Sequence, residues 1–140
     1  TTYPVLPDLF RRPGISGMPI ETTCTCHDDI FEIKIDGAPE ADEVVAIVNE
    51  CYAKFSFKHA IWDFRRASLS GFGAAAFKEV AAAGARFAGK RGPGAKTAMI
   101  VGDSSEVILV KAYAASASEV LPVRIQGFLN ETEARRWLVE

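Results

Sequence analysis

The amino-acid sequence predicts one α/β domain whose mixed, mostly parallel sheet has about five strands, opens with a β-hairpin and carries about four helices. Three observations lead to this fold class. The chain has 140 residues, the usual size of one domain. Its composition, 49% hydrophobic and 24% charged, is that of a packed globular protein. Beyond residue 36, strand-like segments alternate with helical ones, and this alternation requires crossover connections between parallel strands.

Residues 1–20 hold four of the seven prolines and show neither the helical nor the strand period. We therefore predict an irregular proline-rich arm, followed by the α/β domain over residues 21–140. Two interpretations of the arm stay open. It is a leader, with the biological start at Met18, or it is a strap docked through Tyr3, Leu6 and Phe10. In the second case, exchange of the arm between protomers would make a homodimer.

Residues 21–36 have period two, with an interruption near the middle. Cys24 and Cys26 alternate with threonines, and the apolar residues from Phe31 to Ile35 alternate with charged ones. This pattern predicts a hairpin with one buried face. The acidic residues that follow Pro39 favour the start of a helix, because the helix dipole stabilises negative charge there. Apolar residues then recur at spacings of three and four.

Lys58–Phe64 is rich in aromatic and branched residues and predicts a strand. An alanine-rich helix is predicted over Gly71–Gly89. Ser70 is its expected N-cap, since a serine oxygen accepts hydrogen bonds from the free amides of a first turn. Lys90–Gly94 combines two glycines with a proline and predicts a turn.

The last part of the chain repeats the alternation. Lys96–Val101 predicts a buried strand, and Asp103 is the expected N-cap of a helix that ends near Ser118. Val123–Phe128 predicts the final strand. Asn130 is the expected N-cap of a last helix, whose buried apolar residues lie on one face.

Composition excludes several classes of partner. Sixteen Lys and Arg against eighteen Asp and Glu give a net charge of −2, so we expect no nucleic-acid partner and no anionic membrane surface. No window approaches the roughly 20 apolar residues that a membrane span needs. Three cysteines are too few for a disulfide framework, which predicts a reducing compartment and a cytoplasmic protein.

No metal or cofactor is expected. Cys24 and Cys26 point to one face of a strand and His27 to the other, so the three cannot converge on a metal without a bulge. The glycine-rich stretches Gly71–Ala76 and Gly89–Thr97 depart from nucleotide-binding patterns. The first does not directly follow a strand, and the second lacks the required lysine.

Asp63 stands inside an apolar strand and has two interpretations. It forms a structural ion pair with Arg65 or Arg66, or it is the general base of a small enzyme. No second acid, histidine or nucleophile lies near it in the sequence. The structural role is therefore the leading interpretation, and we expect a noncatalytic domain.

A charge asymmetry also stands out. Between Val80 and Gly102 there is no acidic residue, whereas Arg86, Lys90, Arg91 and Lys96 are all present. A solvated basic face and a site for an anion or an acidic partner are the two interpretations.

Three segments resemble a known family: IWDFRRASLSGFG (Ile61–Gly73), AMIVGDSS (Ala98–Ser105) and RIQGFLNETEARRWL (Arg124–Leu138). Together with the order of elements, they are similar to the STAS-like domains, particularly the SpoIIAA-like group, which is grouped with SEC14-type folds. The resemblance covers about residues 21–140. It implies a SpoIIAA-like fold and a noncatalytic regulatory or ligand-binding domain.

Anti-sigma-factor antagonists of this family are phosphorylated at a serine in an Asp-Ser-Ser-Gly-like motif. Aligning that motif here keeps Ser70 and Gly71, but it places Ser68 at the aspartate and Leu69 at the phospho-acceptor. The resemblance therefore implies phosphorylation only if Ser70 takes over after a shift of one residue.

We expect the site at the carboxyl ends of the parallel strands, where open α/β sheets place their ligands. It would bind a protein partner or a small apolar or anionic ligand. The candidate binding residues are Arg65, Ser68, Ser70, Gly71, Asp103 and Ser104.

Overall fold

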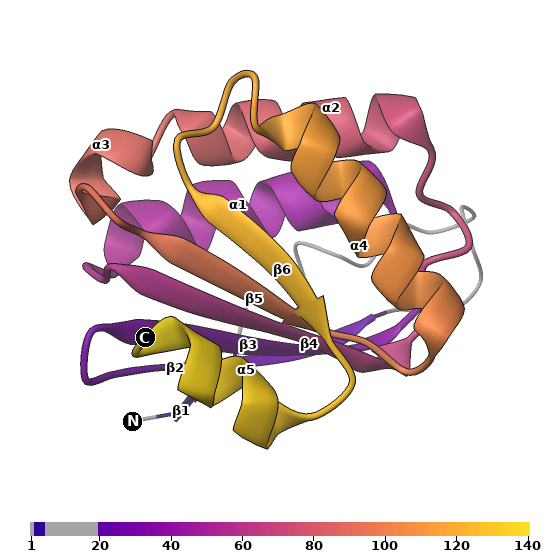
Figure 1. Ribbon diagram of the computed structural model, residues 1–140, viewed down its shortest axis with the longest axis horizontal. Helices are drawn as coiled ribbons and strands as arrows, with labels where there is room; N and C mark the ends of the chain where they lie inside the picture. The colour runs from indigo at the N-terminus through magenta and orange to yellow at the C-terminus, as the bar shows by residue number, and fades with distance from the viewer. Residues whose placement is uncertain (1, 5–19) are drawn as a thin grey trace.

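The computed structural model describes residues 2–4 and 20–140, with side chains from residue 20 onward. These residues form one α/β domain with a six-stranded sheet and five helices (Figure 1). In chain order, the elements are β1 (Thr2–Pro4), β2 (Glu21–His27), β3 (Ile30–Gly37), α1 (Ala41–Lys54), β4 (His59–Ala67), α2 (Ala74–Ala85), α3 (Ala88–Arg91), β5 (Lys96–Ile100), α4 (Ser104–Ala117), β6 (Arg124–Phe128) and α5 (Glu131–Leu138).

The strands lie in the sheet in the order of the chain, from β1 to β6. β1 and β3 both run antiparallel to β2, and every later pair is parallel. This confirms the mixed, mostly parallel sheet that the sequence predicts. Thr2–Pro4, within the predicted arm, adds an edge strand beside β2. Ile20, at the end of the arm, is buried in the main core, and residues 5–19, including Leu6 and Phe10, lie outside the described residues.

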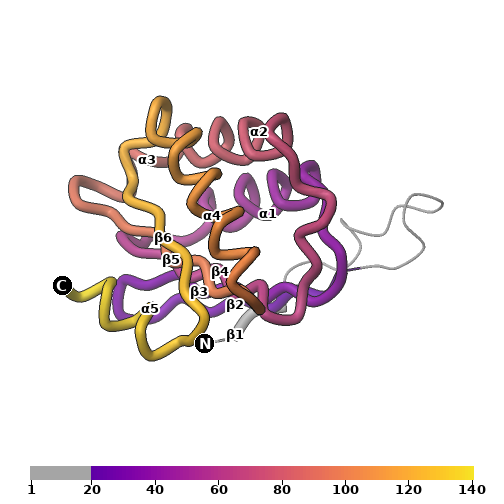
Figure 2. Tube along the Cα trace, turned by 45° about the vertical axis from the view of Figure 1, so that its right-hand side comes forward, coloured from indigo at the N-terminus to yellow at the C-terminus, as the bar shows by residue number. Residues whose placement is uncertain are grey.

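The topology decides which face each helix covers. Each parallel crossover moves one strand further in the same direction, and right-handed connections then place α1, α2 and α4 on the same face. Figure 1 shows α1 and α2 above the sheet and α5 below it. α2 contacts both α1 and α4 (Figure 2), and α5 contacts β5 and β6. No helix of the described residues is long and apolar enough to cross a bilayer.

The predicted hairpin is confirmed, and its turn has an identifiable cause. Asp28 and Asp29 have positive φ angles of 52° and 65°, the conformation of a two-residue turn that matches the twist of the strands. Aspartate tolerates this region better than most residues. The resulting register pairs Cys24 with Ile33, so that both side chains enter the core.

Two of the three predicted N-caps are confirmed. The side chain of Asp103 accepts a hydrogen bond from the N–H of Glu106, and that of Asn130 accepts one from Glu133. The assignment of Ser70 is wrong, because α2 begins only at Ala74, after the N-cap Gly73. A tight turn, in which the Phe72 N–H donates to the Leu69 carbonyl, comes first and directs both apolar side chains inward.

The helix predicted over Gly71–Gly89 is interrupted. Phe87 has φ −108° and ψ 1°, outside the helical region, and separates α2 from the one-turn helix α3. Its ring packs edge-on against Tyr52 at 6.0 Å, which accounts for the break. The predicted turn at Lys90–Gly94 therefore starts two residues late, at Gly92, since Lys90 and Arg91 belong to α3.

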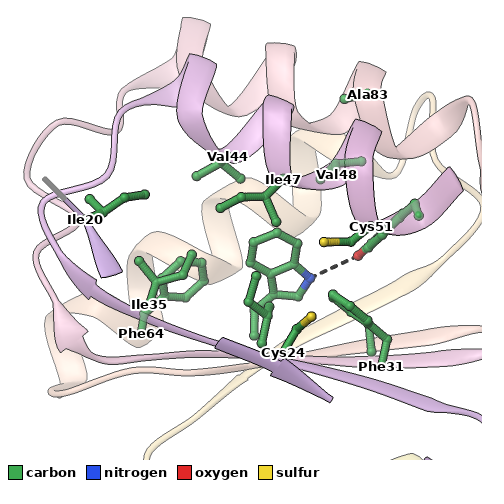
Figure 3. Packing of buried hydrophobic residues seen from close by; sticks show 14 of the residues in the cluster. Ile20, Cys24, Phe31, Ile35, Val44, Ile47, Val48, Cys51, Phe64 and Ala83 are labelled. Atoms are coloured by element: carbon green, nitrogen blue, oxygen red, sulfur yellow. Dashed lines mark hydrogen bonds between the residues drawn. The ribbon is translucent and has the colours of Figure 1, made fainter. Parts of the chain in front are cut away.

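The main core fills the space between the sheet and α1. Cys24, Phe31 and Ile35 reach it from the hairpin, and Val48 and Cys51 reach it from α1 (Figure 3). The dashed line in Figure 3 is the hydrogen bond from the Trp62 indole to the Tyr52 hydroxyl, 2.9 Å long. A second cluster packs α5 against the opposite face, with Trp137 and Leu138 on the strands.

Candidate ligand-binding site

The helix-covered face of the sheet contains an apolar cavity of about 60 Å³. It lies between strands β4 to β6 and helices α1, α2 and α4. About 10–15 Å³ in this measure holds one water molecule, so several waters or a short alkyl chain would fit. Apolar side chains from all these elements form most of its wall, among them Val48, Phe64, Val80, Leu109, Leu121 and Ile125.

The composition of α2 explains why space remains there. The helix sequence AAAFKEVAAAGA offers few side chains large enough to fill the volume above β5. Gly84 lies on the cavity wall, and a Cβ atom at this position would meet the methyl groups of Leu121 at 3.6 and 3.8 Å. Leu121 lines the same cavity, so an added methyl group would take up part of its volume.

One end of the cavity lies beside the β4–α2 connection, at the carboxyl end of β4. Leu69 and Phe72 turn inward from this connection, and the Phe72 ring lies 5.8 Å from that of Phe77. Ser68 and Ser70 stay on the exposed side, with their hydroxyl oxygens 3.0 Å apart. The connection therefore has an apolar inner side and a hydroxyl-bearing outer side.

The buried Arg91 side chain lies at the amino-terminal end of β5. Its Nε, Nη1 and Nη2 donate to the Lys58 carbonyl at 2.9 Å, the Thr97 hydroxyl at 2.9 Å and the Lys96 carbonyl at 2.8 Å. The guanidinium also lies 5.4 Å from the Phe57 ring centre. Burial lowers the pKa of Arg91, because the charged form loses hydration.

Two tyrosines face the same region as Arg91. Burial raises the pKa of Tyr113, and the nearby Tyr52 hydroxyl raises it further, while the charge of Arg91 opposes both effects. The pKa of Tyr52 is also raised, again mainly by burial. Both phenols therefore stay protonated, and each carries a hydroxyl hydrogen at the wall of the cavity.

Solved structures show the same arrangement of helices and strands. One is an uncharacterized protein of the DUF3478 family with a SpoIIAA-like fold from Shewanella loihica PV-4, at 15% identity and a TM-score of 0.57 over 89% of this chain and 99% of that chain. Another is an anti-sigma factor antagonist from Mycobacterium paratuberculosis, at 14% identity and a TM-score of 0.55 over 86% and 95%. This chain has a SpoIIAA-like fold.

No family model matches the sequence, and no curated protein matches it. The two solved structures confirm, at the level of fold, the resemblance that the sequence predicts. Leu69, which the motif match in the sequence places at the phospho-acceptor position, is 8% exposed and lines the cavity. A buried leucine at this position offers no hydroxyl for modification.

The six predicted binding residues lie at the carboxyl edge of the sheet, and all of them are exposed. Gly102, the neighbour of Asp103 in the chain, lies close to Arg65, since a Cβ atom at Gly102 would be 3.7 Å from the Arg65 carbonyl. Ser68, Ser70 and Gly71 belong to the β4–α2 connection, next to the cavity and outside it. Asp103 caps α4, and Ser104 begins that helix. Their role in binding stays a prediction.

Asp63 forms an ion pair with Arg65, one of the two partners that the sequence left open, and Arg66 pairs with Asp36 instead. Arg65 Nε and Nη2 donate to its two carboxylate oxygens at 3.0 and 2.7 Å, and the main-chain N–H of Arg65 adds a third bond. Burial alone would raise the pKa of Asp63, but these bonds and the charge of Arg65 outweigh it and lower the pKa. A general base needs a raised pKa, so the enzyme alternative gains no support.

The residues considered for metal chemistry are separated from one another. Cys24 is buried near Cys51 in the main core, and Cys26 donates to the Ser56 carbonyl. His27 is exposed beside Asp28. His59, on β4, accepts a hydrogen bond at Nδ1 from the Lys96 main-chain N–H and so has a structural role.

Sequence reasoning missed Tyr52, Arg91 and Tyr113 as candidate functional residues. Their convergence depends on three helices that are far apart in the chain, which periodicity does not reveal. One signal was present: the stretch from Val80 to Gly102 without an acidic residue contains Arg91. The sequence left two interpretations of this stretch open, a solvated basic face and a site for an anion or an acidic partner, and it did not reveal that the Arg91 side chain is buried.

Proposed function

We propose that this protein is a noncatalytic STAS-like regulatory domain that binds a small apolar ligand in the cavity between the sheet and α1, α2 and α4. The observation that supports it most is the cavity itself. Protein interiors are packed nearly as tightly as organic crystals, and an unfilled apolar void costs stability. A ligand in this space would recover the lost contacts with Val80, Leu109 and Leu121.

The cavity wall supports a link between binding and regulation. Leu69 and Phe72 contact the cavity, whereas Ser68 and Ser70 are exposed on the same connection. A ligand that presses on the apolar pair would shift the conformations available to the serines, and with them the surface that a partner meets. Binding of a ligand in the cavity would thus change the surface at the carboxyl edge of the sheet.

The test is a titration with 1-hexanol, a small neutral amphiphile, followed by the methyl resonances of Leu69, Leu109 and Leu121 in NMR spectra. The wild-type protein is compared with Gly84→Ala, which adds a methyl group to the cavity wall. Gly89→Ala is the matched control, because a Cβ at Gly89 meets open space.

We expect saturable shifts of the three leucines in the wild type and in Gly89→Ala, with an affinity several-fold weaker in Gly84→Ala. The Gly84→Ala protein should at the same time be more stable by about 0.4–1 kcal/mol, because alanine lowers the conformational entropy of the unfolded chain. Absence of shifts in the wild type, or equal affinity in all three proteins, would contradict a ligand in this cavity.

A protein partner is the second candidate, favoured by the likeness to an anti-sigma factor antagonist. The exposed carboxyl edge, with Ser68, Ser70 and Asp103, is the surface we propose for it. Partner capture would be compared between the wild type, Ser70→Ala and Asp103→Ala. Loss of one specific partner in the variants supports this surface, and unchanged capture by folded variants excludes these side chains.

We place the protein in the cytoplasm. Cys24, Cys26 and Cys51 are free thiols, which supports a reducing compartment. A Western blot of the chain in separated cell fractions would test this, with recovery outside the cytoplasmic fraction as the contradicting result.

A further inference from the structure

Arg91 is a buried cation whose hydrogen-bond partners are all neutral. It is 7% exposed, and its donors reach two main-chain carbonyls and the Thr97 hydroxyl. Across residues 20–140, no carboxylate forms an ion pair with it. A buried charge without a counter-charge is costly, so a fixed positive charge at the wall of an apolar cavity calls for an explanation.

The surroundings of Arg91 add positive charge and little negative charge. Lys96 is also buried, but its amino group lies on the α5 side of the sheet, where it donates to the main-chain oxygens of Trp137 and Glu140. The pKa of His59 shows the combined effect. Burial lowers it, the charges of Lys58, Arg91 and Lys96 lower it further, and Asp29 alone raises it. Within the cavity wall itself, Arg91 is the charged side chain, and no carboxylate of the described residues pairs with it, so its guanidinium is the charge that a ligand in the cavity would meet.

The hydroxyl groups beside Arg91 are available as donors. The Tyr52 hydroxyl accepts from Trp62, and the Thr97 hydroxyl accepts from Arg91, so each keeps its own hydrogen to donate. The hydroxyl of Tyr113 makes no hydrogen bond with another described residue. Tyr113 is 4% exposed, and no fully buried side-chain oxygen of the described residues lacks a partner, so this hydroxyl borders open space. Donors collect at this part of the wall, and the complementary ligand group is an acceptor.

We infer that the ligand is a small monoanionic amphiphile, an alkyl carboxylate, whose head group meets Arg91 and Tyr113. Its alkyl chain would lie against Val80, Leu109 and Leu121. This inference rests on the proposed function and names its ligand class. One guanidinium charge matches one carboxylate charge, whereas a phosphate would bring a second negative charge that the buried site leaves unbalanced.

The test compares three ligands with the same alkyl chain: hexanoate, 1-hexanol and hexyl phosphate. Dissociation constants are measured by NMR titration for the wild type, Arg91→Met and Tyr113→Phe. Lys111→Met is the control, because it removes an exposed positive charge from α4 and leaves the cavity unchanged. Tyr113→Phe removes only a hydroxyl, so it reports on the head group even if Arg91→Met does not fold.

Hexanoate should bind the wild type and Lys111→Met about tenfold more tightly than 1-hexanol, as expected for a hydrogen bond to a charged group. Tyr113→Phe and Arg91→Met should weaken the binding of hexanoate more than that of 1-hexanol, and so bring the ratio several-fold closer to unity. Equal affinity for the acid and the alcohol, or an unchanged ratio in Tyr113→Phe, overturns the inference and leaves the apolar cavity as a binding site. Preference for hexyl phosphate overturns the carboxylate, and binding of no ligand overturns the proposed function as well.

Discussion

The indole N–H of Trp62 donates to the Tyr52 hydroxyl inside the main core, and the two rings lie 6.4 Å apart. Removing only the acceptor leaves a buried donor unpaired, which costs more than the net value of the bond. We expect Tyr52→Phe to lower the free energy of unfolding by about 1–2 kcal/mol. Urea unfolding, monitored by tryptophan fluorescence, measures this change in the free energy of unfolding.

Tyr113→Phe is the matched control for that experiment. It removes the same hydroxyl from a buried tyrosine that has no hydrogen bond to another described residue. Its unfolding free energy should stay within about 0.5 kcal/mol of the wild type. Equal losses in the two variants would contradict the assignment of the bond between Tyr52 and Trp62.

The Asp63–Arg65 pair makes stability depend on pH. The pKa of Asp63 is lowered in the folded chain from an ordinary 3.8, so the unfolded chain binds the proton more readily. The contribution of the ion pair to the unfolding free energy is complete above pH 3.8. It is lost as the pH falls through the lower pKa that Asp63 has in the folded chain. As the pH falls below about 4, the wild type should lose more unfolding free energy than Asp63→Asn. Parallel pH profiles would show that the pair contributes nothing.

At the residue scale, an ion pair at Asp63 was predictable from the sequence. The residues that form the cavity wall were not. Residues two apart on a strand point to the same face, which places Arg65 beside Asp63. Arg91 is different, because its burial depends on α3, a one-turn helix without a sequence pattern of its own. In the sequence, Tyr113 is only one of several apolar positions of the helix α4.

At the scale of elements, the start of a helix was predictable from the sequence where a side chain caps it. Asp103 and Asn130 mark the starts of α4 and α5, because each accepts a hydrogen bond from an N–H three residues later. Ser70 looked equivalent but lies one turn early. The inward packing of Leu69 and Phe72 delays α2, and such tertiary packing leaves no local signal.

Asn130 offers a direct measure of capping. Asn130→Ala removes the bond to the Glu133 N–H, 2.8 Å long, and should cost about 1 kcal/mol of unfolding free energy. Thr132→Ala, at an exposed position of the first turn of the same helix, is the control and should be near neutral. Urea unfolding of both variants tests this. Equal effects would show that the cap adds nothing to the packing of α5.

At the scale of the whole molecule, alternation of strands and helices was enough to predict the parallel sheet, and the lengths of the segments fixed the crossovers. The separation of faces follows from the strand order. With every crossover on one face, the last helix, α5, is left to cover the other. The cavity was beyond prediction, because its volume is what remains after side chains from several elements have packed.

That cavity is the central claim, and xenon tests it most directly, since apolar cavities in proteins bind this uncharged atom. A crystal of the protein pressurised with xenon should show one strong site between β5, α2 and α4, in contact with Val80, Leu109 and Leu121. A filled interior without xenon at this place would contradict the account.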